Sequence, residues 1–349
     1  MQNLKGTMKK NLLTIAVLAL SCLAVQAQDD VQKAAAEAAA ALANAPETKE
    51  AVAKPSFWTN SVEFDLGFNQ TALFNWAAGG YNTISLGVGL DAQANYAKDL
   101  ASWNNRLQLN YGFLWSSDKR GLLQKNNDRI YFESKFALKT TSDSKWKYTA
   151  GLDFRTQFDY GYKNWEEVEG DWVGQKISGF FSPAYLNVGI GIEWAPNDWF
   201  DLNISPLTGG IVFCSDSELR QSYGMKPVDP AAATVLYNSA LFQLGAQMKA
   251  NAKVSINDRF KYETQLVLFY DYLYDYKADN ASKFPIRVNW DNKISWQAAR
   301  FFKISLDTWM IYDPIVLFYD QDPAVGTHKL QFKEFFSVSF AYTISNKKK

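Results

Sequence analysis

Apolar and polar residues alternate along most of the chain, from about residue 60 to the C-terminus, in long runs that turn residues separate. From Ile84 to Tyr96 every second side chain is apolar, and those between are small or polar. Because successive side chains of a strand point to opposite faces, this run has one apolar and one polar face. It exceeds the roughly 5–6 residues of an ordinary strand and suits a tilted strand that crosses a bilayer. The pattern predicts an all-β fold, a single transmembrane antiparallel β-barrel.

The same pattern predicts about twelve strands, an even number as bacterial barrels have. The expected strand ranges are 61–70, 82–98, 103–116, 129–139, 145–160, 184–194, 199–214, 240–254, 259–272, 286–297, 302–313 and 329–345. Pro206 cannot donate a ladder hydrogen bond, so we expect a bulge or an irregular upper end in the seventh strand. A soluble β-sandwich is the competing fold, with shorter strands and hidden aromatic side chains.

The expected connections alternate between short and long. The short ones are 99–102, 140–144, 195–198, 256–258 and 298–301, and the long ones are 117–128, 161–181, 215–239, 273–285 and 314–328. Bacterial barrels have short periplasmic turns and long extracellular loops. We therefore expect the outer membrane of a Gram-negative bacterium, with both termini in the periplasm. Aromatic residues make up 15% of the chain and flank the short turns, as a membrane-interface girdle would.

The first 27 residues have the features of a signal peptide. Lys9 and Lys10 give a basic start, residues 12–20 an apolar core, and residues 25–27 a small-residue cleavage site, with Met8 as an alternative start. A lipoprotein would begin at Cys22, but the sequence lacks the Leu expected three positions before it. Residues 28–56 are Ala-rich and are expected to form a solvated periplasmic tail; a plug of the barrel and a contact with another envelope protein are the alternatives. The barrel is expected to occupy residues 57–349.

Composition removes several classes of chemistry. Once a signal peptide is cleaved, Cys214 is the only cysteine, so neither an internal disulfide nor a cysteine metal site is expected. His328 is the only histidine, and the formal net charge is zero, which gives no electrostatic case for nucleic acid. We expect no metal and no cofactor. The expected partners are outer-membrane lipid and lipopolysaccharide, the barrel-assembly machinery during biogenesis, and an unidentified small solute.

Four segments carry a family resemblance. Residues 75–80 (NWAAGG), 154–158 (FRTQF), 182–186 (SPAYL) and 205–209 (SPLTG) together resemble a Bacteroidota outer-membrane barrel family catalogued as domain of unknown function 3078. The resemblance covers about residue 56 to the end, and it implies the envelope of a Bacteroidota bacterium. It implies no established activity. The last strand also ends in an alternating segment with terminal aromatic residues, which resembles the C-terminal signal of outer-membrane barrels.

The polar faces of the expected strands carry charges of both signs. The candidate lumen residues are Asp91, Arg106, Glu133, Lys135, Asp153, Arg155, Glu193, Lys261, Glu263, Arg287, Asp291 and Lys293. A pore that selects strongly by charge concentrates one sign at a constriction. The mixture leaves two interpretations open: an interior that neutralises itself and holds the barrel's shape, and a lining that tolerates polar or zwitterionic solutes.

A second set of inward positions is not polar. Glycines are expected to widen the lumen at Gly87, Gly89, Gly112, Gly151, Gly189, Gly191 and Gly245. Toward the extracellular half, the inward positions are apolar or aromatic: Leu114, Tyr131, Tyr185, Phe269, Trp309 and Phe335. We interpret this apolar set as a collar that binds an amphipathic solute. The alternatives are a long loop that folds in and packs there, and bulges that turn these side chains toward lipid.

These features favour passage or binding of small solutes through a narrow lumen. Eight-stranded barrels are filled by side chains and 16–18-stranded ones hold open channels, so about twelve strands imply an intermediate interior. A structural or envelope-assembly barrel is the alternative. An outer-membrane lipid hydrolase is a weaker one, because a base must activate the serine of such enzymes and no serine adjoins His328 in sequence. A loop residue such as Ser215 or Ser217 could approach His328 only through folding of the chain. We expect no enzymatic activity.

Overall fold

The computed structural model describes residues 57–71, 81–232, 234–278, 281–319 and 326–346. The expected signal peptide (1–27) and Ala-rich tail (28–56) lie outside these residues, and the compact unit that contains the barrel runs from Phe57 to Lys349. Within the described ranges, no helix is long and apolar enough to cross a membrane.

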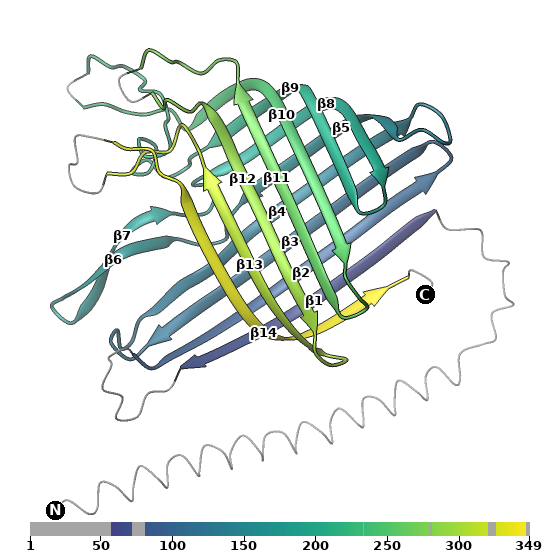
Figure 1. Ribbon diagram of the computed structural model, residues 1–349. Coiled ribbons are helices and arrows are strands. Elements are labelled where there is room, and N and C mark those ends of the chain that lie inside the picture. Colours follow the sequence, from purple (N-terminus) through teal and green to yellow (C-terminus); the bar gives the residue numbers. More distant parts are fainter. Residues whose placement is uncertain (1–56, 72–80, 233, 279–280, 320–325, 347–349) are drawn as a thin grey trace, which may run out of the picture. The chain divides into compact units, whose positions relative to one another are not determined.

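Twelve antiparallel strands close into a barrel, which confirms the fold expected from the alternating pattern (Figure 1). Around the barrel the order is β1, β14, β13, β12, β11, β10, β9, β8, β5, β4, β3 and β2, and β2 pairs back to β1. The strands are β1 (Trp58–Thr71), β2 (Thr83–Lys98), β3 (Ala101–Ser116), β4 (Leu123–Lys139), β5 (Trp146–Thr156), β8 (Ala184–Asn197), β9 (Phe200–Phe213), β10 (Ala240–Ser255), β11 (Phe260–Asp271), β12 (Ile286–Gln297), β13 (Phe302–Tyr312) and β14 (Gln331–Ser345).

The barrel is apolar outside and polar inside. On β1, Phe64, Leu66 and Phe68 are exposed on the outer face, while Glu63 and Asp65 point inward. A wall with this pattern suits lipid, because each outward side chain meets an apolar solvent and the backbone is paired within the sheet. Exposed tryptophans mark the end of the barrel where the turns are short: Trp103, Trp146, Trp194 and Trp199.

Pro206 interrupts the ladder as its missing donor requires. The register shifts between Ile190 and Ile192 of β8, opposite this part of β9, and between Gly245 and Gln247 of β10 on the other side. The register between β3 and β4 also shifts, between Gly112 and Phe113, and beyond this shift the two strands stay paired as far as Leu123 of β4. The predicted loop 117–128 was therefore too long, since β4 already begins at Leu123.

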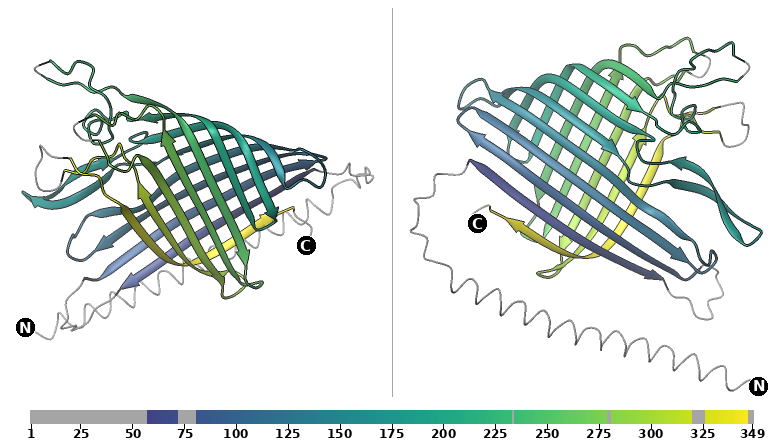
Figure 2. Two further views of the ribbon diagram at one scale, coloured as in Figure 1. Left: turned by 45° about the horizontal axis from the view of Figure 1, so that its top comes forward. Right: turned by 180° about the vertical axis from the view of Figure 1, so that it is seen from behind.

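The predicted loop 161–181 also needs correction, because most of it is strand. Residues Gly161–Val168 (β6) and Asp171–Ser178 (β7) form a separate two-stranded hairpin around Gly170, which has a φ of +90°. The hairpin lies at the end of the barrel where the long loops gather (Figure 2). Strand β5 ends at Thr156 and not at residue 160. Asp159, which the expected strand included, lies beyond the end of β5 and accepts a hydrogen bond from the Tyr111 hydroxyl at 3.2 Å.

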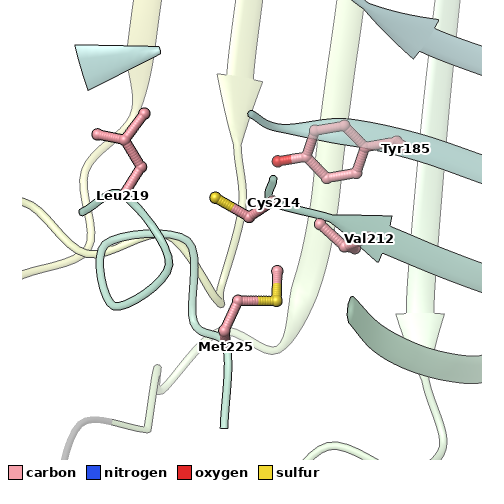
Figure 3. Packing of buried hydrophobic residues seen from close by; sticks show 5 residues of the cluster. All are labelled: Tyr185, Val212, Cys214, Leu219 and Met225. Carbon is pink, nitrogen blue, oxygen red and sulfur yellow. The ribbon is translucent and has the colours of Figure 1, made fainter. Parts of the chain in front are cut away.

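The long connection after β9 packs into the barrel mouth. Leu219 and Met225 of this connection are buried against Tyr185, Val212 and Cys214 (Figure 3). The Arg220 guanidinium holds the same segment through hydrogen bonds to the carbonyl oxygens of residues 214, 215 and 237, at 3.1, 3.1 and 3.0 Å. Part of the mouth is therefore covered.

The closing seam is short. β1 pairs with β2 from Trp58 to Thr71, but with β14 only from Ser61 to Gly67. Every other seam of the barrel has at least ten registered pairs, whereas the β1–β14 seam has seven in the described residues.

Candidate solute site in the barrel lumen

Charged side chains from opposite walls of the barrel meet in the lumen. Lys249 Nζ of β10 lies 2.9 Å from Glu133 Oε1 of β4 and 3.7 Å from Asp153 Oδ2 of β5. Arg129 Nη1 of β4 lies 2.7 Å from Asp291 Oδ2 of β12. Because a buried charge is costly without a partner, these pairs draw the β4–β5 wall toward the β10–β12 wall.

A second group surrounds the buried carboxylate of Glu193, which is 2% exposed. Lys135 Nζ lies 2.5 Å from Glu193 Oε2 and 3.4 Å from Asp201 Oδ1, and Lys147 Nζ lies 2.6 Å from Glu193 Oε1. Two lysines therefore compensate one carboxylate with little access to water.

The remaining polar candidates divide by their surroundings. Arg106 forms an ion pair with Asp91 and lies 3.6 Å from Glu263, while Lys293 lies 3.7 Å from Asp307. Lys261 is exposed, and it joins neither an ion pair nor a cavity lining within the described chain. The last two, Arg155 and Arg287, lie over aromatic rings of the predicted collar.

Cations cover most of the rings in the predicted collar. Tyr131 carries Arg129 at 4.9 Å from its ring centroid, Trp309 carries Lys333 at 4.8 Å, and Phe269 carries Arg287 at 4.6 Å. Two guanidiniums lie over Tyr185, those of Arg155 at 4.9 Å and Arg287 at 5.3 Å. In such cation–π contacts the negative face of the aromatic ring attracts the cation electrostatically.

The other two collar residues have no such cation within the described residues. Phe335 lines a cavity of about 140 Å³ nearer the short-turn end, and Leu114 pairs with Ser85 and Gln124 but lines none of the four described cavities. The collar is thus a mixed cationic and aromatic ring more than an apolar one.

An outer cavity of about 360 Å³ lies at the long-loop end of the lumen. Apolar and aromatic side chains supply part of its wall: Pro183, Tyr185, Tyr223, Trp309, Ile311, Val316 and Phe332. Five charged side chains also line it, Asp128, Arg129, Arg155, Asp313 and Lys333, together with the uncharged polar residues Asn127, Thr156, Gln157 and Gln331. Apolar surface beside polar groups that fix a ligand's orientation is typical of a small-molecule site.

An inner cavity of about 140 Å³ lies between this site and the short-turn end. Its lining has carboxylates and cations from β1, β2, β3, β11, β12 and β13, including Glu63, Asp65, Lys293 and Lys303. The two cavities share only Asn127, Arg129 and Trp309.

Asn127, Arg129 and Trp309, together named the constriction, lie where the two cavities adjoin. Lys333 Nζ donates to Asn127 Oδ1 at 3.0 Å while lying over the Trp309 ring, and Arg129 is held by Asp291. The contacts join β4 to β12, β13 and β14 across the lumen.

The inward glycines fall into two classes. A Cβ on Gly87 would have no heavy atom nearer than 3.8 Å, and one on Gly89 would lie 3.1 Å from Asn110 Oδ1; both residues line the inner cavity. In contrast, a Cβ on Gly191 or Gly245 would lie 2.2 Å and 2.0 Å from backbone oxygens. The prediction that inward glycines widen the lumen therefore fails at Gly191 and Gly245, which permit close strand packing at the bulge.

Lys333 and Asn127, which meet at the constriction, were absent from the sequence-based candidates. Lys333 has the inward parity of Phe335, two residues along β14, so the alternation alone could have found it. Asn127 lay in a predicted loop and takes its place through the β3–β4 register shift, which the sequence pattern did not signal.

His328, considered above as a catalytic base, has a structural neighbour. Its Nδ1 lies 3.1 Å from the Val316 carbonyl oxygen. Ser215, a loop serine that would have to approach His328 to act as a nucleophile, donates its hydroxyl to the Phe180 carbonyl oxygen at 3.0 Å.

A protein family described as "Protein of unknown function (DUF3078)" matches residues 68–162. The match covers a smaller part of the chain than the resemblance of the sequence motifs, and the motifs at 182–186 and 205–209 lie outside it. No curated protein sequence matches the chain.

Several solved structures are similar overall. The COG4313 outer membrane channel from Pseudomonas putida F1 has 11% sequence identity and a TM-score of 0.34, covering 86% of this chain and 100% of its own. The NanC porin has 9% identity and a TM-score of 0.36, with 80% and 98% covered. The Pseudomonas putida toluene transporter TodX has 9% identity and a TM-score of 0.33, with 84% and 90% covered. Identities this low say nothing about a shared solute.

Proposed function

We propose that this barrel takes up small amphipathic solutes from outside the cell and passes them through its lumen across the outer membrane. The observation that carries the proposal is the pair of cavities joined at the Asn127, Arg129 and Trp309 constriction. A capture site next to a narrow passage is what a selective channel needs, since a solute has to bind well enough to enter and weakly enough to leave.

The proposal sets the orientation of the barrel. The long loops and the outer cavity face the exterior, and both termini lie in the periplasm, as short periplasmic turns and an even strand number require. The outer wall contacts membrane lipid and lipopolysaccharide, and the assembly machinery inserts the chain. A Bacteroidota source is the expectation that accompanies the motif resemblance.

Liposome swelling and planar-bilayer conductance test the passage. We expect Gly89→Trp to reduce both, because Gly89 lines the inner cavity, whereas Val88→Trp places the same side chain on the outer face and serves as the matched control. We expect Trp309→Ala to weaken uptake of amphipathic solutes without lowering ion conductance. A wild-type protein that neither conducts nor takes up solute contradicts the proposal.

A structural barrel is the second candidate, and the cross-lumen ion pairs favour it. If Gly89→Trp and Val88→Trp behave identically in both assays while folding normally, the lumen does not carry solute. Ion pairs such as that of Lys249 with Glu133 would then serve to keep the opposite walls of the barrel at a fixed distance.

A further inference from the structure

The charges around the outer cavity do not balance. Two of its charged residues are carboxylates, Asp128 and Asp313, and three are cations, Arg129, Arg155 and Lys333. The identity of a solute depends on which of these charges already have partners.

Both carboxylates are engaged. Asp128 accepts hydrogen bonds from Lys125 Nζ at 2.7 Å and from the backbone N–H groups of Phe158 and Asp159 at 2.7 and 3.0 Å. Asp313 accepts from the Ile315 N–H at 3.2 Å and lies 3.9 Å from Arg287 Nη1. Each carboxylate therefore has a cation outside the set that lines the cavity.

Only one of the three lining cations has a carboxylate partner in the described chain. Arg129 pairs with Asp291. Arg155 Nη1 instead donates to Asn289 Oδ1 at 2.7 Å, and Lys333 donates to Asn127 Oδ1 at 3.0 Å. An amide oxygen satisfies a donor but leaves its positive charge uncompensated, so the cavity keeps two uncompensated cations.

A third donor lies behind this wall. Arg287 is 4% exposed, and neither of its terminal nitrogens has a hydrogen-bond partner in the part of the chain described. It shares the Tyr185 ring with Arg155. A buried guanidinium without acceptors is costly, and an anion nearby would lower that cost.

The lining of the cavity also includes apolar and aromatic side chains, among them Ile311, Val316 and Tyr223. From these contacts we infer that the outer cavity binds carboxylates that carry an apolar body, with the carboxylate toward Arg155 and Lys333. The inference rests on the proposed function and specifies the class of its solute. The inner cavity, where carboxylates and cations alternate, would then hold the anion less strongly.

The test uses three molecules of the same size and different charge. Phenylacetate, 2-phenylethanol and 2-phenylethylammonium are titrated calorimetrically into the full barrel in nanodiscs of zwitterionic lipid. We expect phenylacetate to bind at least about tenfold more tightly than the alcohol, a difference of about 1.4 kcal/mol, and the ammonium ion not to bind. The inference is overturned if the alcohol binds as tightly as the acid, or if none of the three binds.

Two variants assign the charge. Arg155→Gln and Lys333→Gln keep an amide that can donate to Asn289 or Asn127, and each should weaken phenylacetate about tenfold while leaving 2-phenylethanol unchanged. Lys293→Gln is the matched control, since Lys293 lines only the inner cavity. Equal effects of all three variants would contradict the assignment, and heat-modifiable gel mobility shows that each variant has folded.

The liposome assay separates this inference from the proposed function. If neutral solutes pass but phenylacetate does not bind, the barrel is a channel of another specificity. If no solute passes and phenylacetate still binds, the cavity is a binding site and the passage is wrong.

Discussion

Val88 and Gly89 are neighbours in sequence and face opposite solvents. Val88 is 55% exposed on the outer wall, and Gly89 lines the inner cavity beside Asp65. We expect Val88→Arg to destabilise the barrel by about 2–4 kcal/mol, because a cation near the bilayer midplane loses its hydration. Gly89→Arg should assemble, since its guanidinium can reach the carboxylates of the cavity. Unfolding in urea, followed by gel mobility without boiling, measures both.

If both arginine variants assemble equally badly, the facing of β2 is wrong. Facing is the property that the sequence predicts best, because alternation fixes one face for lipid and one for the lumen. It placed Arg106 and Glu263 inside, and they lie 3.6 Å apart. The pairing of Arg129 with Asp291 could not be read in the same way, because it joins β4 to β12 across the lumen and these strands do not pair with each other.

The aromatic residues illustrate the same limit. Alternation placed Tyr185 and Trp309 on the inner face, but it carries no information on which side chain lies over a ring. Arg155 and Lys333 reach these rings from the adjacent strands β5 and β14, where each stands directly opposite its aromatic partner. Such contacts follow from the register of paired strands, which alternation alone does not encode.

Among the strands, β10 shows what the bulge requires. We expect Gly245→Ala to destabilise the barrel by about 1–3 kcal/mol, because its Cβ would meet the Tyr270 carbonyl oxygen at 2.0 Å and force the backbone apart. Gly87→Ala is the matched control, since its Cβ would have 3.8 Å of clearance. Equal unfolding midpoints in urea for the two variants would show that the bulge can absorb the methyl group.

The hairpin β6–β7 is attached to a neighbouring loop by charge. Lys176 Nζ of β7 lies 2.7 Å from Asp216 Oδ2 and 2.8 Å from Glu218 Oε2. Partial burial raises the pKa of Asp216, but the hydrogen bonds from Lys176 and the Glu218 N–H lower it by more. The pKa of Asp216 therefore lies below its ordinary value. The hydrogen bonds to Asp216 and Glu218 raise the pKa of Lys176, so it stays protonated at neutral pH.

This attachment should weaken in acid. A lowered folded-state pKa contributes stability above the ordinary value of about 3.9, and that contribution is lost as the pH falls through the lowered pKa. Spin labels on cysteines at Val173 and Val228, both exposed, should give a distance distribution that broadens between pH 6 and pH 2. The variant Lys176→Gln should be broad at both pH values, and a wild type unchanged at pH 2 would contradict the attachment.

No local signal separated this hairpin from a plain loop, because its strands are short and pair only with each other. In contrast, Pro206 gave a direct signal for the β9 irregularity, since the missing N–H acts whatever the surroundings. A feature that one residue causes by itself, such as the irregularity at Pro206, could be predicted from the sequence. A pair of short strands that exist only because they bond to each other could not.

For the whole molecule, closure into twelve strands followed from the strand count and the alternation of connection lengths. The division of the lumen did not, because it arises from Lys333 and Arg129 meeting residues of distant strands. The cover of the mouth by the connection after β9 was one of the open alternatives, and Leu219 and Met225 show that this connection does pack there.

The short seam between β1 and β14 has a mechanical consequence. Its pairs begin at Ser61 with Ser345, at the short-turn end where both strands meet their chain termini, so a force applied to the two ends would break the seven pairs one after another. Such unzipping needs less force than shearing all pairs at once. In single-molecule pulling we expect an early low-force opening of the ring into a sheet, and a disulfide between cysteines at Val62 and Ile344 should abolish that event. The disulfide would then carry the load directly from one chain end to the other, and the seams of the barrel would stay closed.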